Sequence, residues 1–176
     1  MIRIYLFVLL LTVCSCKEES KTEQQGQTVS STITEKTLKE LEVVIEFKTD
    51  KTDEFKLMLN NITVDEFQTK NIHVIEKVEP STSIEVLKAN FGKGNISKTF
   101  IINFGNKEVK TITLKTITLF YGGKTIVIQP HQMSEYFSFN KSIIQEGDVL
   151  KTVKNNNKHL PVLVLKHKII NELIKG

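Results

Sequence analysis

From Leu41 onward, apolar residues recur at every second position, and this period restricts the fold more than any other feature of the chain. The first such segment places its apolar residues at Leu41, Val43, Ile45 and Phe47. Side chains along a β-strand point to alternate faces, so the pattern predicts a strand with one buried and one wet face. The same alternation returns in short segments with no helical stretches between successive strands. The sequence therefore predicts an antiparallel all-β fold.

The predicted strands are short and are separated by polar turns. They lie within residues 41–48, 55–59, 72–78, 84–87, 100–104, 112–121, 126–128, 149–153 and 161–165. The alternation changes phase between Leu114 and Ile117, which predicts a β-bulge near Lys115 and Thr116. The segment Tyr121-Gly122-Gly123-Lys124 predicts a tight hairpin, because glycine readily supplies the positive φ angles that such turns need.

Many short strands at this spacing predict two antiparallel sheets packed face to face, an antiparallel β-sandwich of the jelly-roll type. Its core is predicted to contain Phe47, Phe55, Phe100, Phe104 and Leu119. Residues Gln132 to Phe139 fit either a short helical turn or an irregular strand. The segment His167 to Lys175 predicts a short C-terminal helix, with Ile169, Ile170, Leu173 and Ile174 on its buried side. Residues 38–176 are of a size that forms one domain.

The first fifteen residues have the pattern of an export signal. Arg3 gives a positive start, residues 4–13 are almost wholly apolar, and Val13-Cys14-Ser15-Cys16 follows. The apolar run is shorter than the roughly 20 residues that a membrane-spanning helix needs. The segment resembles a bacterial lipoprotein signal peptide, which is cut immediately before a cysteine that becomes lipidated. The resemblance implies that residues 1–15 are removed and that Cys16 carries the acyl chains of a membrane anchor.

Lys17, Glu18 and Glu19 follow this cysteine. A charged, acidic cluster here resembles the export signal that sends many Bacteroidota lipoproteins to the outer face of the outer membrane. The resemblance implies a surface-exposed outer-membrane protein, with the periplasmic leaflet as the alternative location. Residues 17–37 are nearly all Glu, Lys, Gln, Ser and Thr, so we expect residues 16–37 to form a lipidated cysteine and a disordered tether.

Cysteine and arginine usage excludes several classes of function for the folded part. Cys14 would leave with the signal, so the mature chain has neither a disulfide pair nor a free thiol nucleophile. Arg3 is the only arginine, and no basic run is interleaved with aromatic residues. Nucleic acid is therefore not an expected partner.

Three segments resemble a sandwich domain that recurs in Bacteroidota extracytoplasmic proteins. They are Thr52 to Leu57, Phe100 to Gly105 and Thr111 to Leu119. Ile101 and Asn103 depart from the pattern, which favours Arg and Asp at these positions. The general form is similar to the galactose-binding-like jelly rolls that serve as carbohydrate-binding modules. The resemblance implies a sandwich in the cell envelope and brings no established catalytic or ligand residue with it.

A glycan site is expected where an aromatic face is exposed beside polar side chains. The chain has no Trp, and the densest aromatic segment outside the predicted core strands is Tyr136 to Asn140. In a strand, Phe137 and Phe139 would face the core and Tyr136 would point outward. We therefore name Tyr136, Glu135, Asn140 and His131 as the candidate ligand-binding residues.

A structural Ca²⁺ is a further candidate, because loop carboxylates hold this ion in many jelly-roll modules. Asp50, Asp53 and Glu54 cluster in one predicted turn. Asp also favours turns for its own backbone hydrogen bonds, which is the alternative explanation. No other cofactor is expected.

Catalysis is not expected, because the chain contains no GxSxG, P-loop or HExxH motif. The carboxylates Glu76, Glu79 and Glu85 are the candidates for glycoside cleavage, and we expect them on the wet face of strands. The sequence thus predicts a non-catalytic envelope lipoprotein that binds a glycan. The alternative is a structural or assembly subunit that packs on a protein partner in an outer-membrane complex.

Overall fold

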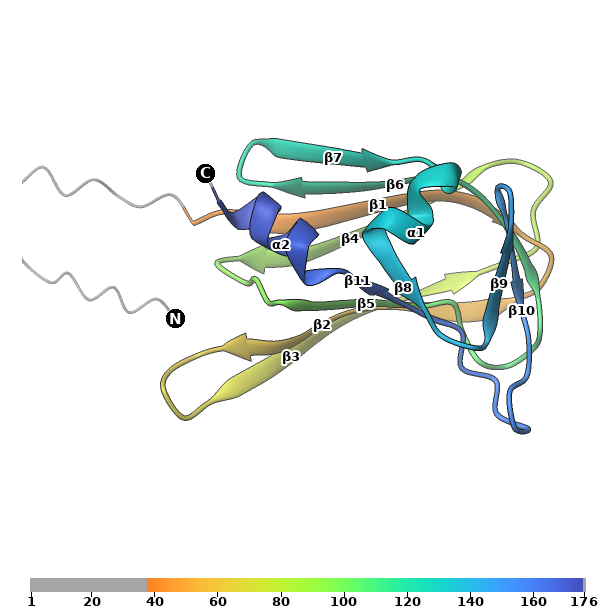
Figure 1. The fold of residues 1–176 in the computed structure, drawn as a ribbon, viewed down its shortest axis with the longest axis horizontal. Coiled ribbons are helices and arrows are strands. Elements are labelled where there is room, and N and C mark those ends of the chain that lie inside the picture. Colours follow the sequence, from red (N-terminus) through yellow and green to blue (C-terminus); the bar gives the residue numbers. More distant parts are fainter. Residues whose placement is uncertain (1–37, 176) are drawn as a thin grey trace, which may run out of the picture. The chain divides into compact units, whose positions relative to one another are not determined.

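Two antiparallel β-sheets lie face to face in the computed structural model, which describes residues 38–175 (Figure 1). Sheet A has the strand order β4-β1-β6-β10-β9, and β7 pairs with the C-terminal half of β6. Sheet B has the order β3-β2-β5-β11-β8. Sheet A consists of β1 (Glu40–Thr49), β4 (Glu85–Lys93), β6 (Thr111–Tyr121), β7 (Lys124–Ile128), β9 (Ile143–Glu146) and β10 (Val149–Thr152). Sheet B consists of β2 (Asp53–Thr63), β3 (Thr69–Val78), β5 (Thr99–Asn103), β8 (Phe137–Phe139) and β11 (Val162–Leu165). The predicted antiparallel β-sandwich is confirmed.

The core forms where the inner faces of the two sheets meet. Along β1, buried and half-buried residues alternate over almost the whole strand, as the two-residue period predicts. Phe47 of sheet A packs against Phe55 of sheet B with their ring centroids 5.1 Å apart, and Phe104 meets Phe55 edge-on at 5.2 Å. All five predicted core residues are buried, so the alternation identified the inner face correctly.

Both irregularities predicted for the central strand are present. The pairing of β1 with β6 shifts between Glu46 and Phe47, whose partners are Thr116 and Leu114, so Lys115 is the extra residue of a bulge. Tyr121 pairs with Lys124 across a two-residue turn. Gly122 and Gly123 have φ angles of 55° and 85°, which is the combination that a tight hairpin of this type requires.

The segment between β7 and β8 combines both alternatives that the sequence left open. A 3₁₀ turn, η1 (Pro130–Gln132), leads into a single helical turn, α1 (Met133–Tyr136), and the chain then enters β8. The C-terminal helix α2 (His167–Ile174) is also present, with Ile169, Ile170 and Leu173 buried. Ile174, which was predicted to be buried with them, is 37% exposed because it lies at the last position of the helix.

The topology gives the sandwich two distinct ends. The chain enters at Leu38, and β1 runs away from this entry end (Figure 1). The entry end also holds the β2–β3 turn at residues 64–68 and the β6–β7 turn at residues 122–123. The far end holds the β1–β2 turn, the β5–β6 loop at residues 104–110 and the loop at residues 153–161. No helix within residues 38–175 is long and apolar enough to cross a membrane.

Candidate functional site

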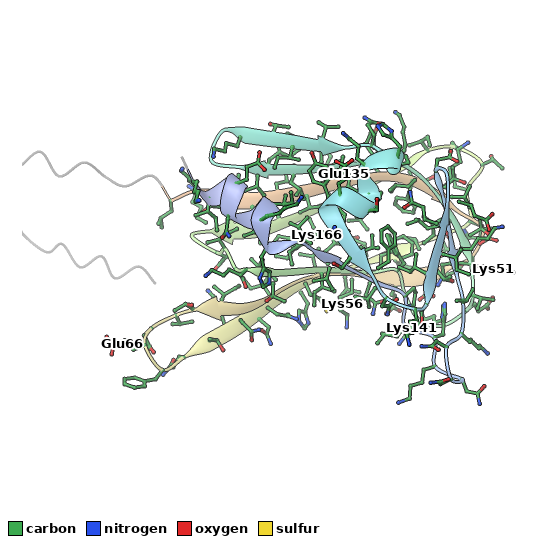
Figure 2. The ribbon with its side chains drawn as sticks, in the orientation of Figure 1. Lys51, Lys56, Glu66, Glu135, Lys141 and Lys166 are labelled. Carbon is green, nitrogen blue, oxygen red and sulfur yellow. The ribbon has the colours of Figure 1, made fainter. Side chains whose placement is uncertain are left out.

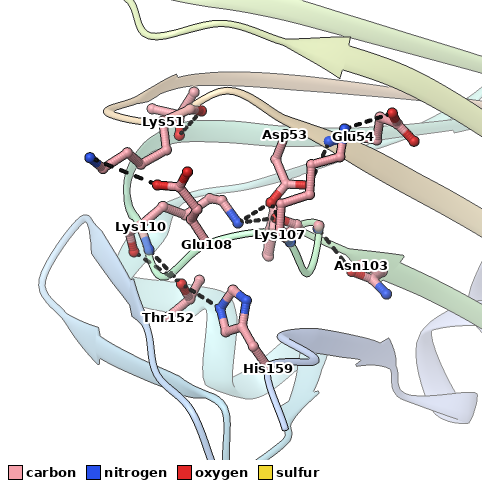
Figure 3. A network of polar contacts seen from close by, with 12 residues as sticks. Lys51, Asp53, Glu54, Asn103, Lys107, Glu108, Lys110, Thr152 and His159 are labelled. Carbon is pink, nitrogen blue, oxygen red and sulfur yellow. Dashed lines mark hydrogen bonds and ion pairs between the residues drawn. The ribbon is translucent and has the colours of Figure 1, made fainter.

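A buried ion pair closes the far end of the sandwich (Figure 3). Lys110 Nζ lies 2.6 Å from Asp53 Oδ2, and the two side chains are 0% and 1% exposed. Lys110 Nζ also donates a hydrogen bond to the carbonyl oxygen of Phe104, at 3.1 Å. Asp53 opens β2 of sheet B and Lys110 precedes β6 of sheet A, so the ion pair joins the two sheets.

The Asp53 carboxylate has partners on both oxygens. Oδ1 accepts the backbone N–H of Glu54 at 2.7 Å, and Oδ2 accepts the backbone N–H of Lys107 at 3.1 Å. Burial alone would raise the pKa of Asp53, but the Lys110 ammonium and these two N–H groups outweigh it and lower the pKa. Gly105 has a φ of +79°, and a Cβ there would lie 2.2 Å from Asp53 Cγ. Only glycine lets the loop pass this close to the carboxylate.

Thr152 and His159 extend this polar cluster to β10 and the loop that follows it. The backbone N–H of Lys110 donates to Thr152 Oγ1 at 2.8 Å, and His159 Nε2 lies 2.9 Å from the same oxygen. His159 Nδ1 is buried and has no well-formed hydrogen bond within the described part of the chain. Burial is the main cause that lowers the pKa of His159, and the charge of Lys110 acts in the same direction. The Asn106 backbone and the Asp53 carboxylate oppose this shift.

Asp53, Lys110, Thr152 and His159 form the far-end cluster, which connects the two sheets and the loop after β10. Both charges are buried and their hydrogen-bonding capacity is largely used within the protein, so we assign the pair a structural role. The buried ion pair was not predicted, although the sequence contains a signal for it. Asp53 continues the buried phase of Phe55 and Leu57, and Lys110 continues that of Ile112 and Leu114. Opposite charges at two buried register positions indicate a buried ion pair.

A surface groove lies on the open side of the sandwich, between the edge strands β3 and β4. Its volume is about 500 Å³. Its lining residues are Phe47, Glu76, Lys77, Val78, Glu79, Pro80, Ser81, Glu85, Val86, Leu87 and Lys88. The loop at residues 79–84 joins β3 to β4 and bounds the groove at the far end. Six of these eleven residues are charged or polar, so the groove is more polar than the mainly apolar pockets that usually hold small ligands.

Two carboxylates enter this groove from the inner faces of the two sheets. Glu76 is paired with Phe55 in sheet B, and Glu85 is paired with Phe47 in sheet A. Directly opposite residues of an antiparallel pair share a face, so both glutamates occupy inward-facing positions. They remain exposed because the edge of the sandwich is open there. They are exposed to solvent as expected of surface charges, although the phase of β3 and β4 places them on the inner face of the strands.

The third glutamate of the groove, Glu79, is fixed by its neighbours. Thr52 Oγ1 donates a hydrogen bond to Glu79 Oε2, and Lys77 Nζ lies 2.6 Å from Oε1. The Lys77 and Thr52 contacts lower the pKa of Glu79. Thr52 directly precedes Asp53 in the chain. The same turn therefore contacts Glu79 of the groove through Thr52 and Lys110 of the buried ion pair through Asp53.

The four residues predicted to bind a ligand lie on η1, on α1 and directly after β8. Tyr136 lies in α1 and is half-buried against the core. The Asn140 side chain is used locally, because its Nδ2 donates to the carbonyl oxygen of Leu160 and its Oδ1 accepts the N–H groups of Ser142 and Val162. Glu135, labelled in Figure 2, and His131 are exposed on α1 and η1.

The three carboxylates predicted to hold Ca²⁺ turn to different partners. Asp50 Oδ1 accepts the N–H of Thr111 at 2.8 Å, Asp53 holds Lys110, and Glu54 pairs with Lys107 at 2.8 Å. An ammonium group 2.6 Å from Asp53 Oδ2 occupies the place that a cation would need. This arrangement does not fit a calcium ion. Nor does any other group of three His, Cys, Asp or Glu side chains in residues 38–175 come together as metal ligands.

The predicted anchor and export residues, Cys16 and Lys17 to Glu19, lie outside the described residues, as do the signal at residues 1–15 and most of the tether. Comparison with known proteins adds no identity: no protein family, no characterised protein and no solved structure matches the chain. We therefore infer the function from the geometry of the groove.

The depressed pKa of His159 makes the stability of the fold depend on pH. An unfolded histidine titrates near about 6.5. Below that pH the unfolded chain binds a proton that the folded chain resists, so we expect the free energy of unfolding to fall as the pH drops from 7 toward the folded pKa. Urea unfolding of wild type and His159→Gln over this range measures the slope.

The His159→Gln chain should lose part of this pH dependence, and His131→Gln, which alters an exposed histidine, should keep all of it. Equal slopes in wild type and His159→Gln would show that the His159 environment does not resist protonation.

Proposed function

We propose that the protein is a non-catalytic, lipid-anchored binding module of the bacterial cell envelope, and that its ligand is a glycan held in the β3–β4 groove. The observation that carries the proposal is the pair of inward-facing carboxylates, Glu76 and Glu85, on opposite walls of that groove. The sandwich fold and the lipoprotein-like N-terminal segment support a module that is held at the envelope.

The chemistry of the groove suits a polyhydroxylated ligand. Carboxylates accept hydrogen bonds from hydroxyl groups, and such charge-assisted bonds are roughly twice as strong as neutral ones. Pro80 offers exposed apolar surface to the C–H face of a sugar ring. The one aromatic residue of the lining, Phe47, is buried and cannot stack on a sugar. The hydrogen bonds of the two carboxylates would therefore have to provide most of the specificity.

Neutralising the two carboxylates tests this assignment. We expect a screen of bacterial surface glycans to find a ligand, and Glu76→Gln with Glu85→Gln to weaken its binding by at least about tenfold. Each change keeps the shape of the side chain and removes its charge. Titration calorimetry measures the dissociation constants.

The matched control is Glu66→Gln with Glu172→Gln, which removes two exposed charges outside the groove and should leave the affinity unchanged. Silence on every glycan, or equal weakening by both double variants, would contradict a glycan site in this groove.

An assembly role is the second candidate, and the unpaired edges of the sandwich favour it. β3 pairs only with β2 and β4 only with β1 within residues 38–175, so both walls of the groove present free backbone groups. Val86 on β4 is also 52% exposed. A partner protein could add a strand to such an edge through main-chain hydrogen bonds. This kind of binding would survive the exchange of Glu76 and Glu85 for glutamine.

The anchor part of the proposal has its own test. Cys16→Ser should move the protein from the detergent-extracted membrane fraction into the soluble fraction, and Cys14→Ser should leave it in the membrane. Exchange of Lys17, Glu18 and Glu19 for alanine should remove the sensitivity of whole cells to added protease. A Cys16→Ser chain that still needs detergent would refute the lipid anchor, and unchanged protease sensitivity would refute the export signal.

A further inference from the structure

The outer half of the β2–β3 hairpin stands free of the rest of sheet B. β2 pairs with β5 only from Lys56 to Asn60, and a register shift follows between Leu59 and Ile62. Asn61, at this irregularity, has a positive φ of 57°. Beyond it β2 has β3 as its only strand partner in the described part of the chain, and the ribbon extends past the body of the sandwich at the entry end (Figure 1).

The tip of this hairpin is ordered by its own hydrogen bonds. Asp65 Oδ1 accepts the backbone N–H groups of Phe67 and Gln68 at 2.8 and 2.9 Å, and Val64 N–H donates to the Gln68 carbonyl at 2.9 Å. The fixed turn holds Phe67 with 93% of its surface exposed. Glu66 lies beside it at the outermost point of the hairpin (Figure 2).

Other exposed apolar residues share the entry end with Phe67. Val64 is 54% exposed in the same turn, and Leu38 is 58% exposed where the described chain begins. Ile174 is exposed at the end of α2. Lys124 of the β6–β7 hairpin donates a hydrogen bond to the carbonyl of Glu172 in this helix. The elements of the same end also carry the exposed lysines Lys70, Lys93, Lys98 and Lys175, together with the acidic residues Glu40, Asp65, Glu66 and Glu172.

We propose that the entry end rests on a phospholipid surface and that Phe67 inserts into the headgroup region. The inference rests on the lipid anchor of the proposed function, because the tether that would carry Cys16 joins the domain at this end. Apolar tips enter the membrane interface while nearby lysines meet lipid phosphates. One Phe binds lipid only weakly, but an anchored domain experiences a high effective concentration of membrane.

Orientation on the membrane would leave the glycan groove accessible. The groove lies near the far end, between the last residues of β3 and the first residues of β4, and the insertion point lies at the entry end. The two sites therefore use different residues, and loss of one does not imply loss of the other.

The test uses the absence of Trp from the chain, which makes the indole of Phe67→Trp a unique fluorophore. Cys16 is the only thiol of residues 16–176, so this chain can be coupled through it to a maleimide lipid in phosphatidylethanolamine and phosphatidylglycerol vesicles. The coupling supplies the anchor chemically, so the result does not depend on natural lipidation. We expect the indole emission of the Phe67→Trp chain to shift to shorter wavelength on coupling and to be quenched by brominated acyl chains.

Leu160→Trp is the control, because Leu160 is 48% exposed at the far end and its replacement should report water in the same vesicles. A second measurement places the reporter Val64→Trp in the chain and compares it with and without Phe67→Ser. The quenching of this reporter measures membrane occupancy, which Phe67→Ser should reduce by about tenfold. Unshifted emission from the Phe67→Trp chain would overturn the proposal and would favour a protein as the partner of the hairpin tip. Equal quenching of the Phe67→Trp and Leu160→Trp chains would overturn it as well, since it would mean unspecific contact.

Discussion

The buried ion pair between Asp53 and Lys110 is the interaction on which the far end of this sandwich depends. It joins the start of β2 in one sheet to the residue before β6 in the other. Two oppositely charged groups removed from water are tolerated only when each has further hydrogen bonds. Here the N–H groups of Glu54 and Lys107 and the carbonyl of Phe104 provide them. Loss of either charge would leave the other buried without compensation.

The surface of the domain has three parts that differ in their construction. The far end is closed by the ion pair and its neighbours, whose polar groups serve the fold. The open side between β3 and β4 keeps a groove in which inward-facing carboxylates meet the solvent. The entry end carries the free hairpin with its exposed Phe67. A module that is anchored at one end and binds a ligand away from that end would use such a division.

The sequence predicted the sandwich because alternation along strands is a local property. It predicted the bulge at Lys115 and the Gly122-Gly123 turn for the same reason. The outward orientation that a strand would give Tyr136 does not apply, because Tyr136 falls in a helical turn, where the two-residue period no longer holds. Glu76 and Glu85 were assigned to the wet face by residue type, although their phase with Val78 and Leu87 points inward. Which strands form the open edges depends on long-range pairing, and no local pattern contains that information.

A double-mutant cycle on the ion pair tests the central structural claim most directly. The cycle compares the urea unfolding free energies of wild type, Asp53→Asn, Lys110→Met and the double variant. Our account predicts that Lys110→Met alone costs about 3–5 kcal/mol, and that the double variant costs clearly less than the sum of the two single changes. Costs that add to within about 0.5 kcal/mol would contradict it, because they would show that the two charges do not depend on each other.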